Sequence, residues 1–500
     1  MSALEIVVLV LAVLTFTYFA VLNGLYLVFT AIASRSVARY FRSRPHAASA
    51  DAFASPLTPG ISVIVPAFNE ETGIVESVRS LLALRYPLQE VVVVNDGSSD
   101  ATIARLHDEF DLVRVERVLR GAISYEPVRA TYVSRRMPAL CVIDKENGGK
   151  ADALNAGIDA ARYPYVCAID ADALMEEDAL LQVAKPILDD PDLVVATGGI
   201  VRIANGCRVD HGRVMEVRLP RSRLATLQVV EYFRAFLVGR VGWSSLNALP
   251  IISGAFGLFN RSLLEAVGGY STKTVAEDVE LVLRLHRYLR ERDEPYRIEF
   301  VAAPVCWTEA PEDVRTLSRQ RRRWQRGLGE SLWHHRRMIG NRRYGTLGLV
   351  ALPFFLFFEF LGPLVEAAGP FAALGAFALD RLSLPFLIAF LTVSVFLGIL
   401  LSIAALALEE LSFRRHARGR EIVRLVAYAV LENLGYRQLV AVWRTLAFVD
   451  LLRRKKAWGA QRRRGFAASP PQASAVAAAR AHRSPSASTP SSPTPRREPG

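Results

Sequence analysis

Two aspartates, Asp170 and Asp172, directly follow the short apolar run Tyr165–Ile169. We expect this run to be a buried strand, because it is short and almost entirely apolar. Alternate residues of a strand point to the same face, so the two carboxylates are predicted to point the same way. Carboxylate oxygens suit Mg²⁺ or Mn²⁺, which usually also bind substrate phosphates. Because two neighbouring carboxylates would otherwise repel each other, the pattern predicts a metal site.

Two further polar clusters each follow a predicted strand. The first follows residues 61–66 and the second, with the sequence NDGSSD, follows residues 90–95. Carboxylate and amide groups at the tip of a strand can receive a base and a ribose, and Gly97 permits the turn. Taken alone, a run such as NDGSSD is more often a turn with a helix cap. The candidate binding residues in these clusters are Pro66, Asn69, Glu70 and Asp96.

A glycine-rich segment, 147–150, leads into the helical pattern of residues 151–161 and ends in Lys150. Backbone amides at such a helix start, together with a lysine, suit a diphosphate. An ordinary surface loop is the alternative. The GxxxxGK[ST] spacing is missing here and no GxGxxG follows the first strand, which argues against a P-loop and against a dinucleotide dehydrogenase.

Two later segments carry polar groups in apolar surroundings. Ser253 and Gly254 lie in an apolar loop, and Glu277 and Asp278 open the helical pattern of residues 279–289. Acidic residues at a helix N-terminus are commonly only complements of the helix dipole. Taken alone, this segment therefore favours a structural interpretation.

An arginine-rich, helix-compatible segment contains Gln320, Arg323 and Trp324. It lies shortly before a long apolar stretch. Without further context, such a segment is typical of a basic helix at a membrane surface.

The elements that must position these residues alternate between strand and helix. Residues 61–66 and 90–95 have strand patterns, and residues 71–84 between them have helical periodicity. This order predicts a mostly parallel sheet covered by helices, with its ligand site beyond the carboxyl ends of the strands. The polar clusters described above lie at those ends.

Three apolar stretches, 6–33, 347–379 and 384–408, are long enough to cross a bilayer, which takes about 20 residues. A cleaved secretory signal is disfavoured for the first, because residues 1–5 contain no Lys or Arg and the apolar run is long. Prolines within the second predict a kinked span. Residues 422–452 carry more charges, which favours an amphipathic interfacial or re-entrant pair.

The chain has 500 residues, of which 51% are hydrophobic, and a net charge of +12. A chain this apolar buries enough surface to exclude wholesale disorder. Its four cysteines contain no CxxC pair, so they give no metal-site signal. Two basic blocks, 319–343 and 453–500, border apolar regions. This placement is typical of the cytoplasmic side of a membrane, so we predict no nucleic acid partner.

Together and in this order, the clusters resemble those of the processive, membrane-bound family 2 glycosyltransferases, among them cellulose, hyaluronan, chitin and poly-N-acetylglucosamine synthases. The resemblance implies an α/β GT-A domain, Rossmann-like and nucleotide-sugar-binding, on the cytoplasmic side of the inner membrane and inserted between transmembrane helices. It also implies a UDP-sugar donor, a glycan or lipid-linked acceptor, contacts with membrane lipids, and accessory export subunits or a homo-oligomer.

The resemblance predicts five parts of the chain. These are an N-terminal transmembrane anchor (1–45), a GT-A glycosyltransferase domain (58–312), interfacial helices carrying the QxxRW motif (313–345), a C-terminal membrane region (346–456) and a disordered basic tail (457–500).

The resemblance also implies a role for each matching residue. For the donor, Pro66, Asn69, Glu70, Asp96, Lys150, Asp170 and Arg323 bind the UDP-sugar, and Asp170 and Asp172 hold Mg²⁺ or Mn²⁺. For the acceptor, Asp278 is the general base and Ser253, Gly254, Glu277, Gln320 and Trp324 bind the sugar. The family's TED signature reads Ala276–Asp278 here, so any threonine contact is missing or comes from Thr274.

One base and no enzymic nucleophile imply inverting transfer of a hexose or N-acetylhexosamine, by resemblance N-acetylglucosamine or glucose. Two alternatives stay open at this point. A single-addition enzyme acting on a lipid or polyprenyl phosphate shares several motifs but usually lacks QxxRW. A non-catalytic membrane receptor or scaffold would not need its intact aspartates.

Overall fold

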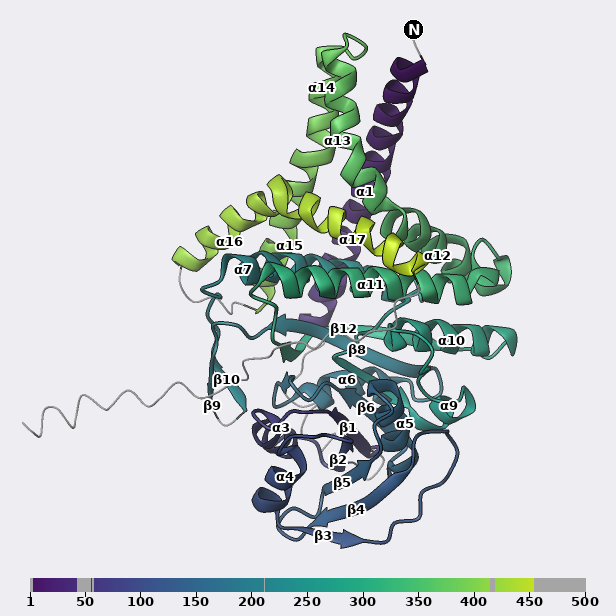
Figure 1. Cartoon of the computed structure of the whole chain (residues 1–500), viewed down its shortest axis with the longest axis vertical. Coiled ribbons are helices and arrows are strands. Elements are labelled where there is room, and N and C mark those ends of the chain that lie inside the picture. The colour runs from purple at the N-terminus through teal and green to yellow at the C-terminus, as the bar shows by residue number, and fades with distance from the viewer. Residues whose placement is uncertain (1–2, 43–54, 56–57, 211, 414–418, 454–500) are drawn as a thin grey trace, which may run out of the picture.

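The computed structural model describes residues 3–42, 55, 58–210, 212–413 and 419–453 (Figure 1). The predicted basic tail, 457–500, lies outside the described residues.

The centre of the molecule is a ten-stranded sheet in the order β3-β4-β5-β2-β1-β6-β11-β8-β12-β7. Its strands are β1 (Ile61–Ala67), β2 (Gln89–Asp96), β3 (Leu112–Val115), β4 (Val128–Ser134), β5 (Leu140–Lys145), β6 (Tyr165–Ile169), β7 (Leu174–Met175), β8 (Val194–Ile203), β11 (Phe256–Asn260) and β12 (Arg297–Thr308). The predicted strands at 61–66, 90–95 and 165–169 are therefore confirmed.

The sheet is mixed, and the prediction of a mostly parallel sheet is wrong. Strands β5, β2, β1 and β6 are parallel neighbours, as are β8 and β12. However, β3, β4 and β5 form an antiparallel edge, and β11 runs antiparallel to both β6 and β8. The strands of that edge follow one another through connections without a helix, which antiparallel pairs permit and parallel pairs do not.

Helices cover both faces of the parallel part. They are α3 (Ile74–Leu82), α4 (Thr102–Phe110), α5 (Lys150–Ala160) and α6 (Ala179–Asp189), and a small hairpin of β9 (Arg208–Asp210) and β10 (Arg213–Glu216) lies beside them. Val91–Val94 of β2 are fully buried, as expected for a central strand with both faces covered.

A layer of helices lies between the sheet and the projecting ends of the apolar helices (Figure 1). It contains α7 (Arg223–Tyr232), continued by η1 (Phe233–Arg240) and α8 (Val241–Ser245), and also α10 (Glu277–Glu291), α11 (Val314–His334), α16 (Gly419–Leu431) and α17 (Arg437–Leu452). Helix α17 packs along α11. Helices α16 and α17 are broken at Leu434 and Gly435, where the backbone leaves helical geometry.

Two helices are long and apolar enough to cross a membrane, Glu5–Arg42 within α1 (Ala3–Arg42) and Leu384–Phe413, which joins α14 (Leu384–Leu391), η6 (Thr392–Phe396) and α15 (Leu397–Phe413). A third span is possible if the bent pair Leu347–Phe360 and Gly362–Ala378 counts as one. The pair bends by 49° where Pro363 begins α13 (Gly362–Ala378), which agrees with the predicted kink.

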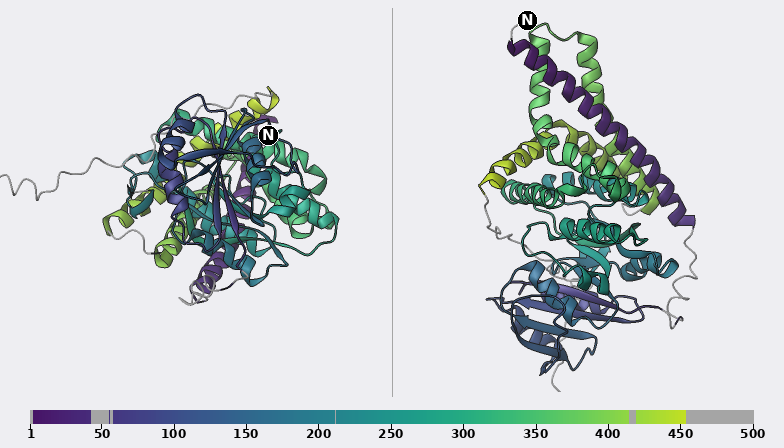
Figure 2. Two further views of the ribbon diagram at one scale, coloured as in Figure 1. Left: turned by 90° about the horizontal axis from the view of Figure 1, so that it is seen from below. Right: turned by 90° about the vertical axis from the view of Figure 1, so that its right-hand side faces the viewer.

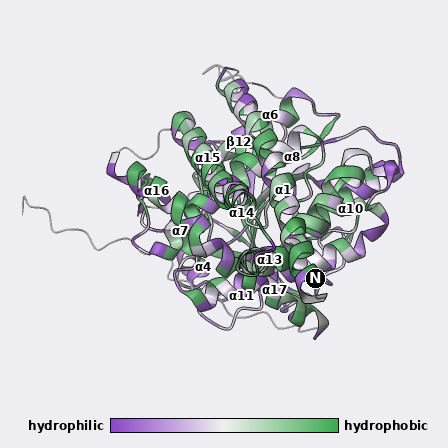
Figure 3. Cartoon of the chain, turned by 90° about the horizontal axis from the view of Figure 1, so that it is seen from above, coloured by the Kyte–Doolittle hydropathy of each residue, from purple (hydrophilic) through white to green (hydrophobic). Residues whose placement is uncertain are grey.

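The apolar helices project together from one end of the molecule (Figure 2). Viewed from above, hydrophobic residues cover much of α1, α13 and α14 (Figure 3). Many of these residues are exposed, including Leu14, Phe371 and Ile388. Such large exposed apolar surface is unusual for a protein surrounded by water.

Candidate active site

The first polar clusters meet because parallel strands end at the same edge of the sheet. In the strand register Ala67 of β1 is opposite Asn95 of β2, and Asp96 is opposite Lys145 of β5. The amide of Asn95 donates a 2.7 Å hydrogen bond to Asp144. The edge therefore combines three carboxyl-terminal strand ends, as the sequence predicted.

The loops after β1 and β2 hold each other in place. The Asn69 amide donates to Ser98 Oγ at 3.0 Å, and Asn69 Oδ1 accepts from the Ser99 amide at 2.9 Å. Asn69 has a φ of 56°, a conformation that asparagine tolerates better than most residues. The backbone amide of Glu70 donates to Thr102 Oγ1 at 2.9 Å, and Pro66 lies half-buried at the end of β1.

Asp96 is 2% exposed and its carboxylate points into the protein. It accepts hydrogen bonds from Lys145 Nζ at 2.8 Å and from the amides of Gly148 and Gly149 at 3.0 and 2.7 Å. Lys145 is fully buried and also pairs with Asp152 Oδ1 at 2.5 Å. Asp96 thus fixes the glycine-rich loop, and its predicted contact with uridine remains a prediction.

Lys145 was missed by the sequence analysis. The residue ends β5, so its neighbour Asp96 is 49 residues away in the chain. A usable signal existed, because aligning the ends of two parallel strands places Lys145 beside Asp96.

Lys150 begins α5 and is surrounded by carboxylates. Its Nζ lies 2.7 Å from Asp170 Oδ1 and 3.1 Å from Glu277 Oε1, and it donates to the Gly254 carbonyl at 2.8 Å. Burial lowers the pKa of Lys150, but the charges of Asp170 and Glu277 outweigh burial and raise it overall. Four residues that were predicted separately therefore meet around one ammonium group.

Asp278 lies in the same group, at the start of α10. A Cβ added to Gly254 would lie 3.2 Å from Asp278 Oδ2 and 3.5 Å from Lys150 Nζ, so the backbone approaches both groups closely. Burial raises the pKa of Asp278, and the neighbouring charge of Glu277 raises it further. Ser253 Oγ accepts from the Ala255 amide at 3.2 Å and shapes this loop.

Asp170 and Asp172 lie in a turn rather than on a continued strand, because β6 ends at Ile169 and the Ala173 amide donates to the Asp170 carbonyl. The argument from strand alternation is therefore wrong, although the charges of both carboxylates act on Cys306. Burial raises the pKa of the Cys306 thiol, and the charges of Asp170 and Asp172 raise it further.

The residues beside the Lys150 group fit a divalent cation. The charges of Asp170, Glu277 and Asp278 act on Lys150, and those of Asp170 and Asp172 act on Cys306, so hard oxygen donors that suit Mg²⁺ or Mn²⁺ gather here. The predicted metal site is therefore chemically reasonable on the residues present.

Helix α11 carries the last motif. Gln320 Oε1 is buried and has no hydrogen-bond partner among the described residues, and Arg323 is half-buried. Trp324 is 42% exposed, and the Arg321 guanidinium lies 4.4 Å from its ring centre. Arg321 pairs with Glu231 of α7 at 2.8 Å. The motif is thus held by the Arg321–Glu231 pair on one side, and the Trp324 ring is exposed on the other.

Two contacts connect α11 to the acidic group. A Cβ added to Gly327 would lie 2.4 Å from Ala276 Cβ, so α11 is in close contact with the residue before Glu277. Burial raises the pKa of Tyr232, while Arg321 lowers it and Asp172 raises it. The charges of Asp172 and of Arg321 on α11 therefore both act on Tyr232.

The Thr274 hydroxyl faces α11 rather than the acidic group. It lies 3.4 Å from Glu330 Oε2, and Thr274 Oγ1 also accepts from the Ala276 amide at 3.3 Å. The structure therefore gives Thr274 a role in joining α11 to the segment before α10.

A polar cavity of about 160 Å³ lies between the apolar helices and α7. Its charged lining residues are Glu231, Arg234, Glu359, Glu366, Glu432, Arg437 and Arg444. Arg234 pairs with Glu432 at 2.7 Å and Arg444 with Glu359 at 3.1 Å. Because Glu231 also binds Arg321, the cavity borders the QxxRW helix.

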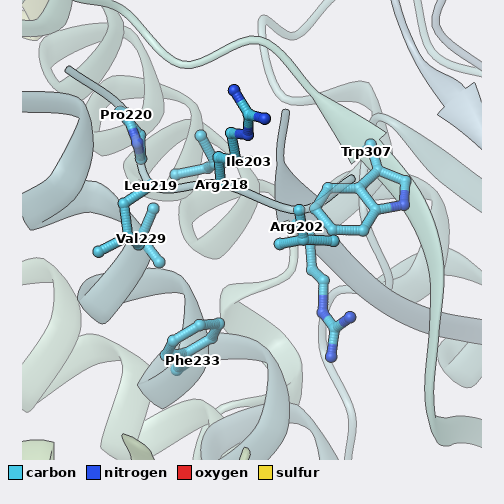
Figure 4. Close-up of a pocket in the computed structure, with 9 residues that line it drawn as sticks. Arg202, Ile203, Arg218, Leu219, Pro220, Val229, Phe233 and Trp307 are labelled. Carbon is cyan, nitrogen blue, oxygen red and sulfur yellow. The ribbon is translucent and has the colours of Figure 1, made fainter. Parts of the chain in front are cut away.

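A smaller pocket lies at the carboxyl end of β8, between Arg202, Trp307 and Phe233 (Figure 4). Its other lining residues are mostly apolar. It contains none of the predicted site residues, so it does not enter the proposed chemistry.

The sequence of residues 59–327 matches the family described as glycosyltransferase like family 2. The chain belongs to glycosyltransferase family 2. This confirms the predicted family and the α/β fold class with its flanking apolar helices.

Curated members of the family resemble this chain over part of their length. They include the poly-β-1,6-N-acetyl-D-glucosamine synthases of Staphylococcus epidermidis (30% identity over 280 residues) and Staphylococcus aureus strain COL (31% over 278 residues). Each match covers 55% of this chain and 55% of the relative. The chain thus spans about half the length of the curated relatives it matches.

Solved structures give weaker matches. The mannosyltransferase PcManGT of Pyrobaculum calidifontis, in complex with GDP-Man and Mn²⁺, has a TM-score of 0.49 and 20% identity, covering 88% of this chain and all of that one. Staphylococcus aureus TarS 1–349 in complex with UDP-GlcNAc has a TM-score of 0.37 and 19% identity, covering 76% and 92%.

Proposed function

We propose that this family 2 chain transfers a hexose or N-acetylhexosamine from a UDP-sugar to a growing β-linked polysaccharide, with inversion, at the inner face of the cell membrane. The observation that carries the proposal is the convergence of Lys150, Asp170, Gly254, Glu277 and Asp278 beside the helix that carries Gln320, Arg323 and Trp324. The similarity to poly-β-1,6-N-acetyl-D-glucosamine synthases favours N-acetylglucosamine as the transferred sugar.

Loss of UDP leaves negative charge on a diphosphate, which this site could stabilise. Mg²⁺ or Mn²⁺ held by Asp170 and Asp172 would neutralise part of that charge when bound. Lys150 supplies a fixed positive charge at the start of α5, and Arg323 supplies a second on α11. The amides of Gly148 and Gly149 are engaged by Asp96, so Asp96 acts here by shaping the loop.

The acceptor hydroxyl must lose a proton as it attacks the sugar. Asp278 suits this role, because burial raises its pKa towards the range in which a carboxylate accepts protons well. Lys150 pairs with Glu277 beside it, so the positive charge of Lys150 compensates the negative charge of Glu277. With one base and no enzymic nucleophile assigned, an α-linked donor would give a β-linked product.

The polar cavity supports polymer synthesis over single addition. It lies between helices that are apolar enough to cross a membrane, and it borders the QxxRW helix through Glu231. A polysaccharide leaving the site needs a polar route of this kind. A single-addition enzyme acting on a lipid-linked acceptor is the second candidate, and it needs no such route.

The proposal extends to the organisation of the chain. We assign residues 58–312 to the transferase domain on the cytoplasmic side, residues 1–45 and 346–456 to the membrane, and residues 313–345 to its interface. Two helices of the described residues, or three with the bent pair, are available to surround a glycan, so accessory export subunits or a second copy would complete its path.

The test is transfer activity in membranes that contain the full chain. We expect UDP release and a polymeric product, identified by mass spectrometry, from one member of a panel of UDP-sugars, and loss of both with EDTA. Asp278→Asn should lower transfer by about 10² to 10⁴. Asp189→Asn, an exposed position on α6, is the matched control and should keep wild-type activity.

Absence of UDP release from every UDP-sugar would overturn the proposal. A single sugar added to a lipid would support the second candidate instead. Full activity in excess EDTA would contradict the metal requirement alone.

A further inference from the structure

Two adjacent histidines and a glutamate form a cluster away from the donor site. Possible ligand atoms of Glu280, His334 and His335 all lie within 4.8 Å of one another. Glu280 is on α10, two residues after Asp278, and the histidines are at the C-terminal end of α11. The cluster therefore joins the helix of the proposed base to the helix of the QxxRW motif.

The burial of these residues is unusual for a simple surface cluster. His335 is 1% exposed and Glu280 is 4% exposed. The nearest contact between them, His335 Nε2 to Glu280 Oε1, measures 3.4 Å. His335 Nδ1 is buried without a hydrogen-bond partner among the described residues. A buried imidazole nitrogen without a partner is costly unless something binds it.

The opposite side of the cluster is open. His334 is exposed, and its ring stands nearly perpendicular to that of His335, at 81° with centroids 4.9 Å apart. A cation could therefore enter from solvent past His334 and reach the buried residues. Three protein ligands would leave at least one coordination position for water.

Glu280 is oriented by Arg284, the next turn of α10. Arg284 Nε donates to Glu280 Oε1 at 3.1 Å, and a terminal nitrogen donates to Oε2 at 2.8 Å. Arg284 also donates to the carbonyls of Val267 and Gly269. Supporting hydrogen bonds of this kind fix the direction of metal-binding carboxylates.

We propose that Glu280, His334 and His335 bind a transition-metal ion, Zn²⁺, and that this ion links α11 to α10. Two imidazole nitrogens and one carboxylate oxygen suit Zn²⁺ or Co²⁺. The all-oxygen pair Asp170 and Asp172 suits Mg²⁺ or Mn²⁺ instead. The two sites therefore differ in metal preference as well as in place.

The experiment uses the full chain purified in detergent, stripped of metal and placed in excess Mg²⁺. We expect one equivalent of Zn²⁺ to be retained after gel filtration, and Co²⁺ to give a visible absorption band at the same stoichiometry. Zn²⁺ should also raise the unfolding temperature. His334→Gln should weaken Zn²⁺ binding by at least about tenfold and remove the rise in unfolding temperature.

Two control variants make the assignment specific. His107→Gln changes a histidine of α4 that packs on Tyr132, and it should bind Zn²⁺ like wild type. Asp172→Asn alters the proposed donor-side site and should also keep Zn²⁺. Because His334 is exposed, its variant should fold even if His335→Gln does not.

The inference is overturned if wild type retains no Zn²⁺ in excess Mg²⁺, or if His334→Gln and Glu280→Gln retain it as well as wild type does. The latter result would place the ion elsewhere and leave only an ion pair between His335 and Glu280. Neither result depends on transfer activity, so it leaves the proposed function untouched.

Discussion

Lys145 is a buried cation that holds the loops of the proposed donor side together. It lies between Asp96 and Asp152, at 2.8 and 2.5 Å, and is fully buried. Asp152 in turn accepts from the Glu126 amide, and Asp96 from the glycine-rich loop. One ammonium group therefore compensates two carboxylates that hold separate loops.

Replacing this lysine should destabilise the whole domain. Removing one partner of a buried ion pair typically costs about 3–5 kcal/mol, because a buried charge is left uncompensated. We expect Lys145→Met to lower the unfolding temperature clearly and to weaken UDP binding. Lys185→Met, which breaks an exposed pair with Asp189, should cost only about 0–1 kcal/mol. Similar thermal stability of the two variants would contradict this account.

Asp278 should make activity and stability respond to pH in opposite ways. Its pKa is raised by burial and by Glu277, so the folded protein binds this proton more tightly than the unfolded chain does. Its contribution to stability therefore falls as the pH rises from the unfolded pKa, about 3.9, through the folded pKa. The rate of transfer should rise over the same window, because the base must be deprotonated.

Thermal unfolding of Asp278→Asn at pH 7 tests whether the charged Asp278 carboxylate lowers the stability of the fold. The variant loses the penalty of a buried charge, so it should unfold at a higher temperature than wild type while transfer is nearly lost. Asp189→Asn should show no such gain, because Asp189 is exposed. A lower unfolding temperature for Asp278→Asn would show that the charged carboxylate stabilises the fold, which would contradict this account.

For single residues, the sequence predicted which side chains form the site better than it predicted which of them contact one another. Lys150, Asp170, Gly254, Glu277 and Asp278 were each candidates, and the structure brings them together. Their order in the chain indicated a site, but no local pattern could show that Lys150 contacts Asp170 and Glu277. Such contacts depend on how distant strands and helices pack.

Among the elements, local patterns predicted the strands and helices of the first half well. The pattern of residues 151–161 became α5, and residues 279–289 became most of α10. Sheet order was not predictable in the same way, since β11 enters between β6 and β8 from a distant part of the chain. The Asp170–Asp172 turn was missed because the alternation of a strand was extended beyond Ile169, where the strand ends.

The contact between α11 and the segment before α10 is an element-scale feature that can be tested. Gly327 allows α11 to approach Ala276, and an added Cβ would lie 2.4 Å from Ala276 Cβ and 3.2 Å from its backbone nitrogen. Neither atom is at the end of a flexible side chain. Gly327→Ala must therefore shift α11 away from Glu277 and Asp278.

We expect Gly327→Ala to reduce transfer by at least about tenfold, because small displacements of catalytic groups have large effects on rate. UDP binding should change less, since of the proposed donor residues only Arg323 lies on α11. Gly24→Ala is the matched control, because Gly24 is also helical and a Cβ there meets nothing within 4 Å. Equal transfer rates for the two variants would show that the spacing between α11 and α10 does not control the site.

At the scale of the whole molecule, the candidate site lies between the sheet that carries the proposed donor residues and the helices that border the polar cavity (Figure 1). Helix α11 is fastened to the membrane-side helices by several polar contacts. Arg322 pairs with Asp450 at 2.6 Å, and Arg444 donates to Gln325 Oε1 at 2.7 Å. The QxxRW motif is therefore fixed relative to the cavity as well as to the acidic group.

Trp324 should control product length because of where it lies between these parts. Its ring packs against Arg321, which binds Glu231, and Glu231 lines the cavity together with Tyr436. A sugar stacked on the exposed side of Trp324 would thus be held on the helix that borders the cavity. If that stacking is worth as much as a pair of aromatic rings, its loss costs about 0.5–1.5 kcal/mol.

Trp324→Ala should therefore release the growing chain about two- to tenfold more often and shorten the product, with UDP binding little changed. Trp333→Ala is the matched control, because Trp333 lies on the same helix, is 72% exposed and contacts Arg336. The measurement is product length per active enzyme in membranes. If Trp324 only anchors α11 at the membrane surface, its variant should lower the amount of folded protein and leave product length unchanged. Normal product length from Trp324→Ala would thus reject the acceptor role and favour the single-addition alternative.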